Sequence, residues 1–192
     1  MKGDSLLAKV DRRRFLKHAG LGSIAMASIP ILGRVVPVFA DEGGDQIEFT
    51  FAAQSKATVA GVTHQLTMAG DGKFGPSQVE GGGSFNHFRV VDGFPRPLVA
   101  AGTWKAKRLV SWNSIGTFGV FAAGILELEV DLIRELPSRK VVPAKLDVVC
   151  NIQAVPLLTG QEEGFVLDVD GISFEPAGVG ITLFSTAGDE RD

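Results

Sequence analysis

Residues 41–192 are predicted to form a single all-β domain of about eight antiparallel strands, arranged either as a β-barrel or as a β-sandwich. Two features predict this class: apolar and polar side chains alternate with a period of two, and turn residues interrupt the alternation at short intervals. No ten-residue segment there shows the 3.6-residue period of an amphipathic helix. These residues number about 150, which is the usual size of one domain with its own core.

Four strand segments are expected in the first half of the domain: residues 47–52, 56–68 (divided at Ala60-Gly61), 77–80 and 84–91. In the first, Ile47, Phe49 and Phe51 alternate with Glu48, Thr50 and Ala52, which is typical of a half-buried strand. Residues 70–83 are rich in glycine and are expected to form a connection that contains only the short strand. The run Gly81-Gly82-Gly83-Ser84 predicts a turn or a bulge, because a phosphate cradle would need a helix N-terminus after it.

Two long strands are expected next, at residues 98–112 and 117–134. Residues 92–97, just before them, contain two prolines that lack ladder donors, so this segment is expected to be a loop or a sheet edge. In the second long strand the even-numbered residues from Phe118 to Leu132 form an apolar face, whereas the odd-numbered ones change from apolar to acidic after Ile125. This change predicts a strand that passes from under a cover into solvent.

Three further strands are expected at residues 144–154, 164–169 and 179–186, with a tight hairpin turn at Asp170-Gly171. If the strands at 117–134 and 144–154 pair about Ser138, apolar residues face apolar residues and Glu129 faces Asp147. Two facing carboxylates cost energy unless one is protonated or a cation intervenes. Glu129 and Asp147 are therefore candidate calcium ligands or an acid/base pair; the alternative is two solvated carboxylates that lean apart. The same register places Asp131 opposite Lys145.

Candidate ligand contacts lie on two other strands. His87 is favoured over His64 because residues 84–89 group several polar side chains with two aromatic rings. A metal site would need both histidines and a further ligand, and their order in the chain gives no pairing. Arg108 is expected to share a strand face with Trp104 and Trp112. There it would stack on an indole ring, pair with a buried carboxylate, or bind the anionic group of a ligand in a cavity.

Cys150 is the only cysteine, so no disulfide within the chain is possible. Alternation places its side chain on the face of Leu146, Val148 and Ile152, which predicts a small buried hydrophobic residue. A catalytic thiol would need a neighbouring base, and no histidine lies near Cys150 in the sequence.

The N-terminus has a distinctive order of residues. Arg12 and Arg13 are followed by one further arginine and then by Phe15, Leu16 and Lys17. This order resembles the signal peptides of the twin-arginine translocation (Tat) pathway. The residue before the pair departs mildly from them, since it is aspartate in place of the more usual serine or threonine.

The resemblance implies a Tat signal peptide over residues 1–40, cleaved between Ala40 and Asp41. It also implies that the Tat translocase is a partner and that the domain is periplasmic, at the cell surface or extracellular. The apolar stretch is diluted by glycine, serine and proline and interrupted by Arg34, so no stable membrane span is expected. An ordinary N-terminal helix and an uncleaved anchor remain the alternatives.

The charge of the domain excludes two classes of partner. Residues 1–40 carry seven basic and two acidic side chains, so with −3 on the whole chain the remainder carries −8. Binding to nucleic acid depends on neutralising phosphates, and adhesion to an anionic membrane needs a basic surface. Neither is expected of an acidic domain.

Two functions remain open. No nucleophile elbow, Walker loop or dinucleotide-binding fingerprint is present, and no cofactor is indicated. The favoured hypothesis is a non-enzymatic binding module that receives a small apolar ligand or a protein partner at a barrel mouth or at an apolar patch near Phe121 and Ile125. The alternative is a small isomerase or hydrolase that uses His87, Arg108 and a carboxylate in a cavity.

Overall fold

The computed structural model describes residues 46–76 and 78–186. The predicted signal peptide, including Arg12, Arg13, Phe15, Leu16 and Lys17, lies outside these residues, as does the predicted cleavage site at Ala40 and Asp41. Within the described ranges, no helix has the length and apolar character needed to cross a membrane.

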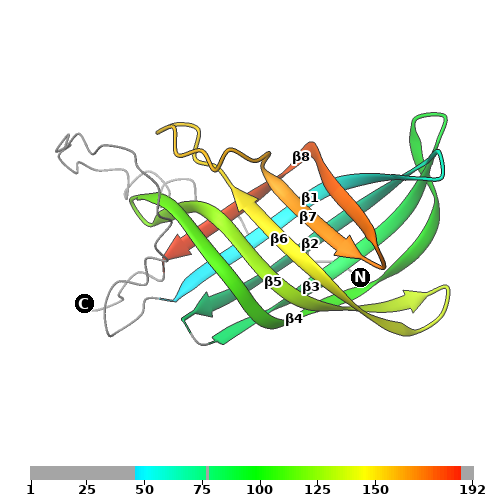
Figure 1. Cartoon of the computed structure of the whole chain (residues 1–192), viewed down its shortest axis with the longest axis horizontal. Helices are drawn as coiled ribbons and strands as arrows, with labels where there is room; N and C mark the ends of the chain where they lie inside the picture. Colours follow the sequence, from blue (N-terminus) through cyan, green and yellow to red (C-terminus); the bar gives the residue numbers. More distant parts are fainter. Residues whose placement is uncertain (1–45, 77, 187–192) are drawn as a thin grey trace, which may run out of the picture. The chain divides into compact units, whose positions relative to one another are not determined.

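Eight antiparallel strands close into a barrel (Figure 1). They are β1 (Ile47–Val59), β2 (Val62–Gly75), β3 (Gln78–Val91), β4 (Phe94–Phe118), β5 (Phe121–Leu136), β6 (Lys140–Cys150), β7 (Gly164–Val169) and β8 (Ile172–Thr186). Each strand pairs with the next one along the chain, and β8 pairs with β1 to close the ring. The predicted all-β class and strand number are confirmed, and the closure selects the barrel over the sandwich.

One end of the barrel, which we name the mouth end, carries three two-residue hairpins. Ala60-Gly61 joins β1 to β2, Asp92-Gly93 joins β3 to β4, and Asp170-Gly171 joins β7 to β8. Both residues of each pair have positive φ angles, between 48° and 80°. This is the backbone of a type I′ turn, whose twist matches that of the strands and which favours glycine at its second position. The hairpin predicted at Asp170-Gly171 is confirmed.

The two prolines near the start of β4 lie at a sheet edge. β4 begins at Phe94 and includes Pro95 and Pro97, but its ladder with β5 begins only at Ala101. Its ladder with β3 is irregular in the same region. A strand residue with one open side can lack an N–H donor, so prolines are tolerated there. Of the two alternatives for this segment, the edge is the correct one.

The glycine-rich segment forms strands, and its prediction as a connection was wrong. β2 continues to Gly75 and β3 begins at Gln78. All the glycines from Gly70 to Gly83 are therefore ladder residues of these two strands. The reason lies inside the barrel: a Cβ atom on Gly81 would lie 2.8 Å from the Phe49 ring, and one on Gly83 would lie 2.7 Å from Nε1 of Trp104. Large rings occupy the space that side chains would fill.

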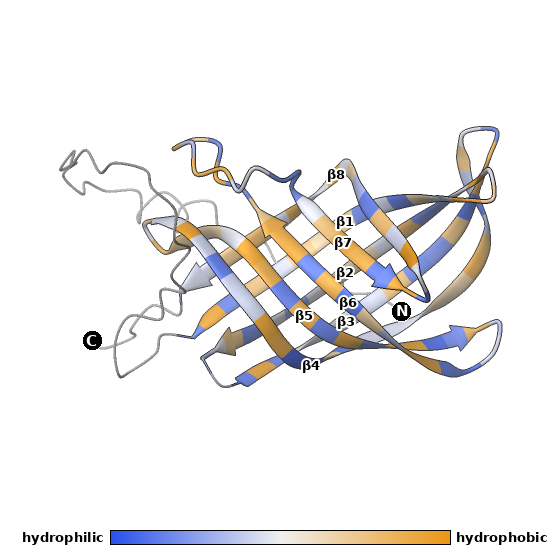
Figure 2. Ribbon diagram, in the orientation of Figure 1, coloured by the Kyte–Doolittle hydropathy of each residue, from blue (hydrophilic) through white to orange (hydrophobic). Residues whose placement is uncertain are grey.

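The barrel interior is packed with apolar side chains. Alternating hydrophobic and hydrophilic bands run along the strands (Figure 2), and the apolar positions face inward. On β5 the predicted apolar face is confirmed from Ala122 to Leu132, since Leu126, Leu128 and Val130 are almost completely buried, whereas Phe118 and Val120 lie at the β4–β5 turn and are exposed. The predicted cover over its other face is also confirmed. Ala123 is fully buried there, and Leu157 of the 151–163 loop lies over Gly116, the partner of Ala123 on β4.

The expected apolar patch is exposed at Phe118 and Val120, at the β4–β5 turn, but not at Phe121 and Ile125. Both side chains are half-buried, and Ala123 between them is fully buried. The loop that connects β6 to β7 provides the cover, and period-two alternation carries no information about such a loop.

Candidate functional site

A cavity of about 310 Å³ lies inside the mouth end of the barrel. Its wall is apolar apart from three side chains: His87 on β3, Arg134 on β5 and Asp170 in the β7–β8 hairpin. Leu66, Phe85 and Leu167 belong to the apolar part. All three are buried. The cavity has the character of a small-ligand site, with an apolar lining and few polar groups.

The rings deeper in the barrel account for the position of the cavity. Phe51 packs between Trp104 and Phe165, with ring centroids 5.8 Å and 5.9 Å away. These rings fill the interior there. Closer to the mouth end the wall includes the small side chain of Ala100, together with valines on β4, β6 and β7, so space is left open.

A histidine pair lies at the wall of the cavity. Nδ1 of His64 on β2 lies 2.9 Å from Nε2 of His87, so one of the two nitrogens donates a proton to the other. The His87 ring also lies edge-on to Phe174, at 5.5 Å between centroids. The pairing was not predicted, because His64 and His87 are diagonal neighbours across two strands whose register the sequence did not specify.

The His87 ring is neutral at neutral pH. Burial, together with the nearby His64, lowers the pKa of His87 from 6.5 to about 4. Nε2 faces His64, while Nδ1 makes no hydrogen bond to any of the described residues. His87 can therefore offer a ligand one donor or one acceptor, according to its tautomer.

Arg134 supplies the positive charge of the cavity wall. Its Nε donates to the carbonyl oxygen of Ser138 at 3.0 Å, and its Nη2 donates to the Ser138 hydroxyl at 3.2 Å. No ion pair forms between Arg134 and a carboxylate of the described residues. Sequence reasoning missed this residue. Its signal was present, because Arg134 is the first polar residue on the even-numbered face of β5 after Leu132.

Trp104 and Trp112 belong to the core below the cavity. Trp104 packs against Phe49 and Phe51, and its Nε1 donates to the carbonyl oxygen of Ala69 at 3.1 Å. Trp112 packs against Phe74 and Phe184. Neither indole lines the mouth cavity, so the structure gives both tryptophans a packing role.

Arg108 lies on the outer wall, and the prediction that it shares a face with the tryptophans was wrong. Its side chain is 60% exposed and binds Glu129 through both Nε and Nη2. The cause is a pair of irregularities in β4, between Ala106 and Arg108 and between Leu109 and Ser111. Each adds a residue to β4 relative to β5, so the alternation reverses at Arg108 and is restored before Trp112.

The ion pair changes the acidity of both partners. The hydrogen bond from Arg108 lowers the pKa of Glu129, and the bond to Glu129 raises the pKa of Arg108.

His87 lines the cavity inside the barrel, whereas Arg108 lies on the outer surface of the barrel. The enzyme hypothesis built on His87, Arg108 and a carboxylate loses its convergent set of residues.

The predicted Glu129–Asp147 pair is also a register error. β5 and β6 turn about Pro137, so Glu127 faces Asp147 and Glu129 faces Lys145. A shift of two residues keeps every side chain on its face, so the apolar pattern does not detect it.

A lysine lies between the two carboxylates that face each other, Glu127 and Asp147. Nζ of Lys145 lies 3.8 Å from Oε1 of Glu127 and 3.4 Å from Oδ1 of Asp147. Burial raises the pKa of Asp147, and the charge of Lys145 opposes that shift. Among the described residues, no group of three or more acidic, histidine or cysteine side chains is arranged to hold a metal ion.

Cys150 is buried, as predicted. It is 3% exposed, and its Sγ lies 3.4 Å from the carbonyl oxygen of Thr182. Burial raises the pKa of the thiol, which disfavours the reactive thiolate.

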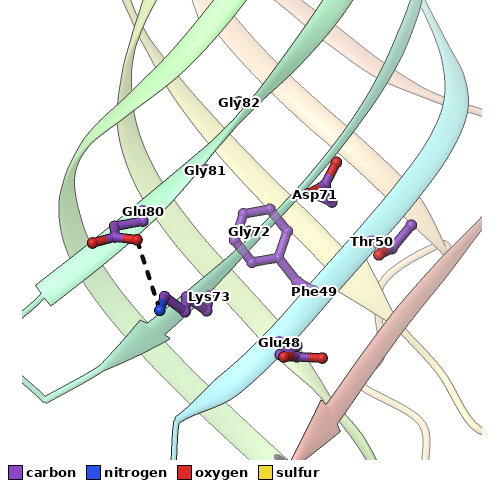
Figure 3. Close-up of a pocket in the computed structure, with 9 residues that line it drawn as sticks. All are labelled: Glu48, Phe49, Thr50, Asp71, Gly72, Lys73, Glu80, Gly81 and Gly82. Carbon is purple, nitrogen blue, oxygen red and sulfur yellow. Dashed lines mark ion pairs between the residues drawn. The ribbon is translucent and has the colours of Figure 1, made fainter.

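A second hollow lies on the outer wall over β1, β2 and β3 (Figure 3). Gly72, Gly81 and Gly82 line it, and of these Gly82 stands at an outward position, paired with Asp71 and Lys105, where it contributes no side chain to the surface. Its charged groups include an ion pair between Lys73 and Glu80, at 3.8 Å. It is a shallow, polar surface, whereas the mouth cavity is apolar and lies inside the barrel.

Comparison with known proteins finds no matching family, no matching curated protein and no matching solved structure.

Proposed function

We propose that the protein is a non-enzymatic binding module that holds a small apolar ligand in the mouth cavity. The observation that carries the proposal is the composition of the cavity wall, which is apolar except for His87, Arg134 and Asp170. Burial of apolar ligand surface would supply most of the affinity, at about 25 cal/mol per Å². The few polar groups would orient the ligand.

The proposal includes export of the domain, supported by the order of Arg12, Arg13, Phe15, Leu16 and Lys17. The Tat translocase is the partner during export, and the ligand is met outside the cytoplasm. An open barrel mouth with an apolar interior suits a carrier or sensor of a sparingly soluble compound.

The neutral fluorescent probe N-phenyl-1-naphthylamine tests the cavity. We expect its fluorescence to rise on mixing with the purified domain, with a saturable dependence on concentration. Ala100→Phe places a ring in the cavity and should abolish the rise, because Ala100 is buried and lines the wall.

Thr103→Phe is the matched control, because it adds the same ring to the exposed outer face of the same strand. It should leave probe binding unchanged. Circular dichroism checks that both variants fold. Equal binding by both folded variants, or equal loss in both, would contradict the cavity as the site.

A further inference from the structure

The chemistry of the cavity wall defines the class of ligand further, if the proposed function holds. We propose that the ligand is an amphipathic monocarboxylic acid whose carboxylate binds Arg134 and whose apolar body lies against Leu66, Phe85 and Leu167. The proposal rests on the proposed function, because it identifies the ligand of the same cavity. Three observations carry it, one for each polar group of the wall.

The first observation is the state of Arg134. Ser138 takes two of the guanidinium N–H groups and fixes the plane of the side chain across the β5–β6 turn. Three of its five N–H donors are left for other partners. A planar, fixed guanidinium with free donors matches the two oxygens of a carboxylate.

Arg134 has no ion-pair partner among the described residues, as is also true of Lys105 and Lys140, but of these three cations it is the one that lines the cavity. Arg108 binds Glu129, Lys107 binds Asp131 at 3.3 Å, and Lys145 lies between two carboxylates. Arg134 is the only cation that lines the cavity, and no carboxylate of the described chain lies within ion-pair distance of it. A ligand carboxylate would neutralise this charge where the apolar wall strengthens electrostatic attraction.

The second observation is the neutral ring of His87. Because its pKa is low, His87 adds no second positive charge to the cavity at neutral pH. It can accept or donate one hydrogen bond through Nδ1. Its position suits a polar substituent on the ligand and does not favour a second carboxylate.

The third observation is Asp170, an exposed residue of the β7–β8 hairpin at the rim of the same cavity. It would repel a second anionic group on the ligand, and because Asp170 is exposed, solvent screens part of this repulsion. One cation, one neutral ring and one carboxylate together favour a ligand with a single negative charge.

Competition between matched ligands tests this inference. Decanoate and 1-decanol share the same chain length and differ in the charged group. Each is titrated against bound N-phenyl-1-naphthylamine at pH 7.5, below its aggregation concentration. We expect decanoate to displace the probe at a roughly tenfold lower concentration, since a hydrogen bond to a charged group is worth about one such factor or more. Decanedioate should displace it less well than decanoate.

Two variants assign the preference to Arg134. Arg134→Met keeps an apolar stem and should remove the advantage of decanoate over 1-decanol while 1-decanol still binds. Arg108→Met removes an exposed arginine of the same barrel and should leave the advantage intact. Asp170→Asn removes the opposing charge and should strengthen decanoate binding; asparagine also tolerates the positive φ angle of this turn.

The outcomes separate this inference from the proposed function. Equal displacement by decanoate and 1-decanol would overturn the acid assignment and leave the cavity intact as an apolar site. A preference that survives in Arg134→Met would overturn the role of Arg134. If the neutral probe does not bind, decanoate is titrated by calorimetry. Binding that is lost in Arg134→Met then supports the acid site alone, and no binding overturns both proposals.

Discussion

His64 and His87 share a hydrogen bond of 2.9 Å between Nδ1 and Nε2 at the mouth of the barrel. The pair lies between a hydrogen-bonded sheet and an apolar cavity, and His87 is protonated only at a pH well below its ordinary range, since its pKa is lowered to about 4. The lowered pKa of His87 has a direct consequence for the stability of the folded barrel.

Stability should fall as pH decreases from 6.5 toward 4. In this range the unfolded chain protonates His87, whereas the folded barrel does not, because its pKa is lowered to about 4. The loss contributed by His87 should be about 1–2 kcal/mol, since the ring is half-buried and water screens part of the effect. Urea unfolding at pH 7.0 and 4.5 measures it.

His87→Gln is the variant that assigns this pH effect. Glutamine keeps a polar side chain of similar length and does not titrate in this range. The difference in unfolding free energy between the two pH values should be smaller in the variant by the contribution of His87. An unchanged difference would show that other groups, such as carboxylates, account for the whole slope.

Gly83→Ala should destabilise the barrel by about 1–3 kcal/mol, the usual cost of overpacking. The added methyl group would collide with the Trp104 indole and with the backbone of β2. Thermal and urea unfolding measure the loss. Gly75→Ala is the control, because a Cβ there meets only Cγ of Gln46, at 4.0 Å, an ordinary van der Waals contact. A destabilisation equal to that of Gly83→Ala would contradict the steric explanation.

Lys145→Met should destabilise the protein more at pH 7 than at pH 4. Without the ammonium group, the pKa of Asp147 rises further, because burial and the charge of Glu127 both raise it. When a carboxyl group has a higher pKa in the folded than in the unfolded state, the protein loses stability as the pH rises from the unfolded pKa to the folded one. The unfolding free energies of the variant and the parent are compared at both pH values.

Lys73→Met is the matched control for Lys145→Met. Lys73 pairs with Glu80, whose side chain is 72% exposed, so its loss should have little effect at either pH. A similar pH-dependent loss in both variants would argue against a special role for the lysine between Glu127 and Asp147.

Replacing Arg12 and Arg13 together by lysine should block export of the chain. The Tat resemblance depends on this arginine pair, while Arg14 occupies the variable position that follows it. A C-terminal reporter fusion, followed by cell fractionation, measures the outcome. Arg14→Lys should be exported normally. Normal export of the double variant would exclude the Tat interpretation.

Features that depend on a local pattern of residues could be predicted from the sequence. The even-numbered apolar face of β5 identified a long half-covered strand, Asp170-Gly171 identified a hairpin turn, and the alternation around Cys150 identified a buried position. These depend on period-two alternation and turn chemistry, which adjacent residues specify. They were sufficient for the fold class.

Which side chains meet depends on contacts between segments that are distant in the sequence. Two irregularities in β4 move Arg108 outward, and a two-residue register shift exchanges Glu129 for Glu127 opposite Asp147, yet both leave the apolar pattern intact. The glycines of β2 and β3 are strand residues because of rings distant in the sequence. The His64–His87 pair arises from the register between β2 and β3, and the exposure of Arg134 to a cavity arises from the closed barrel. Such relationships depend on packing between distant segments, which a local periodic pattern does not encode.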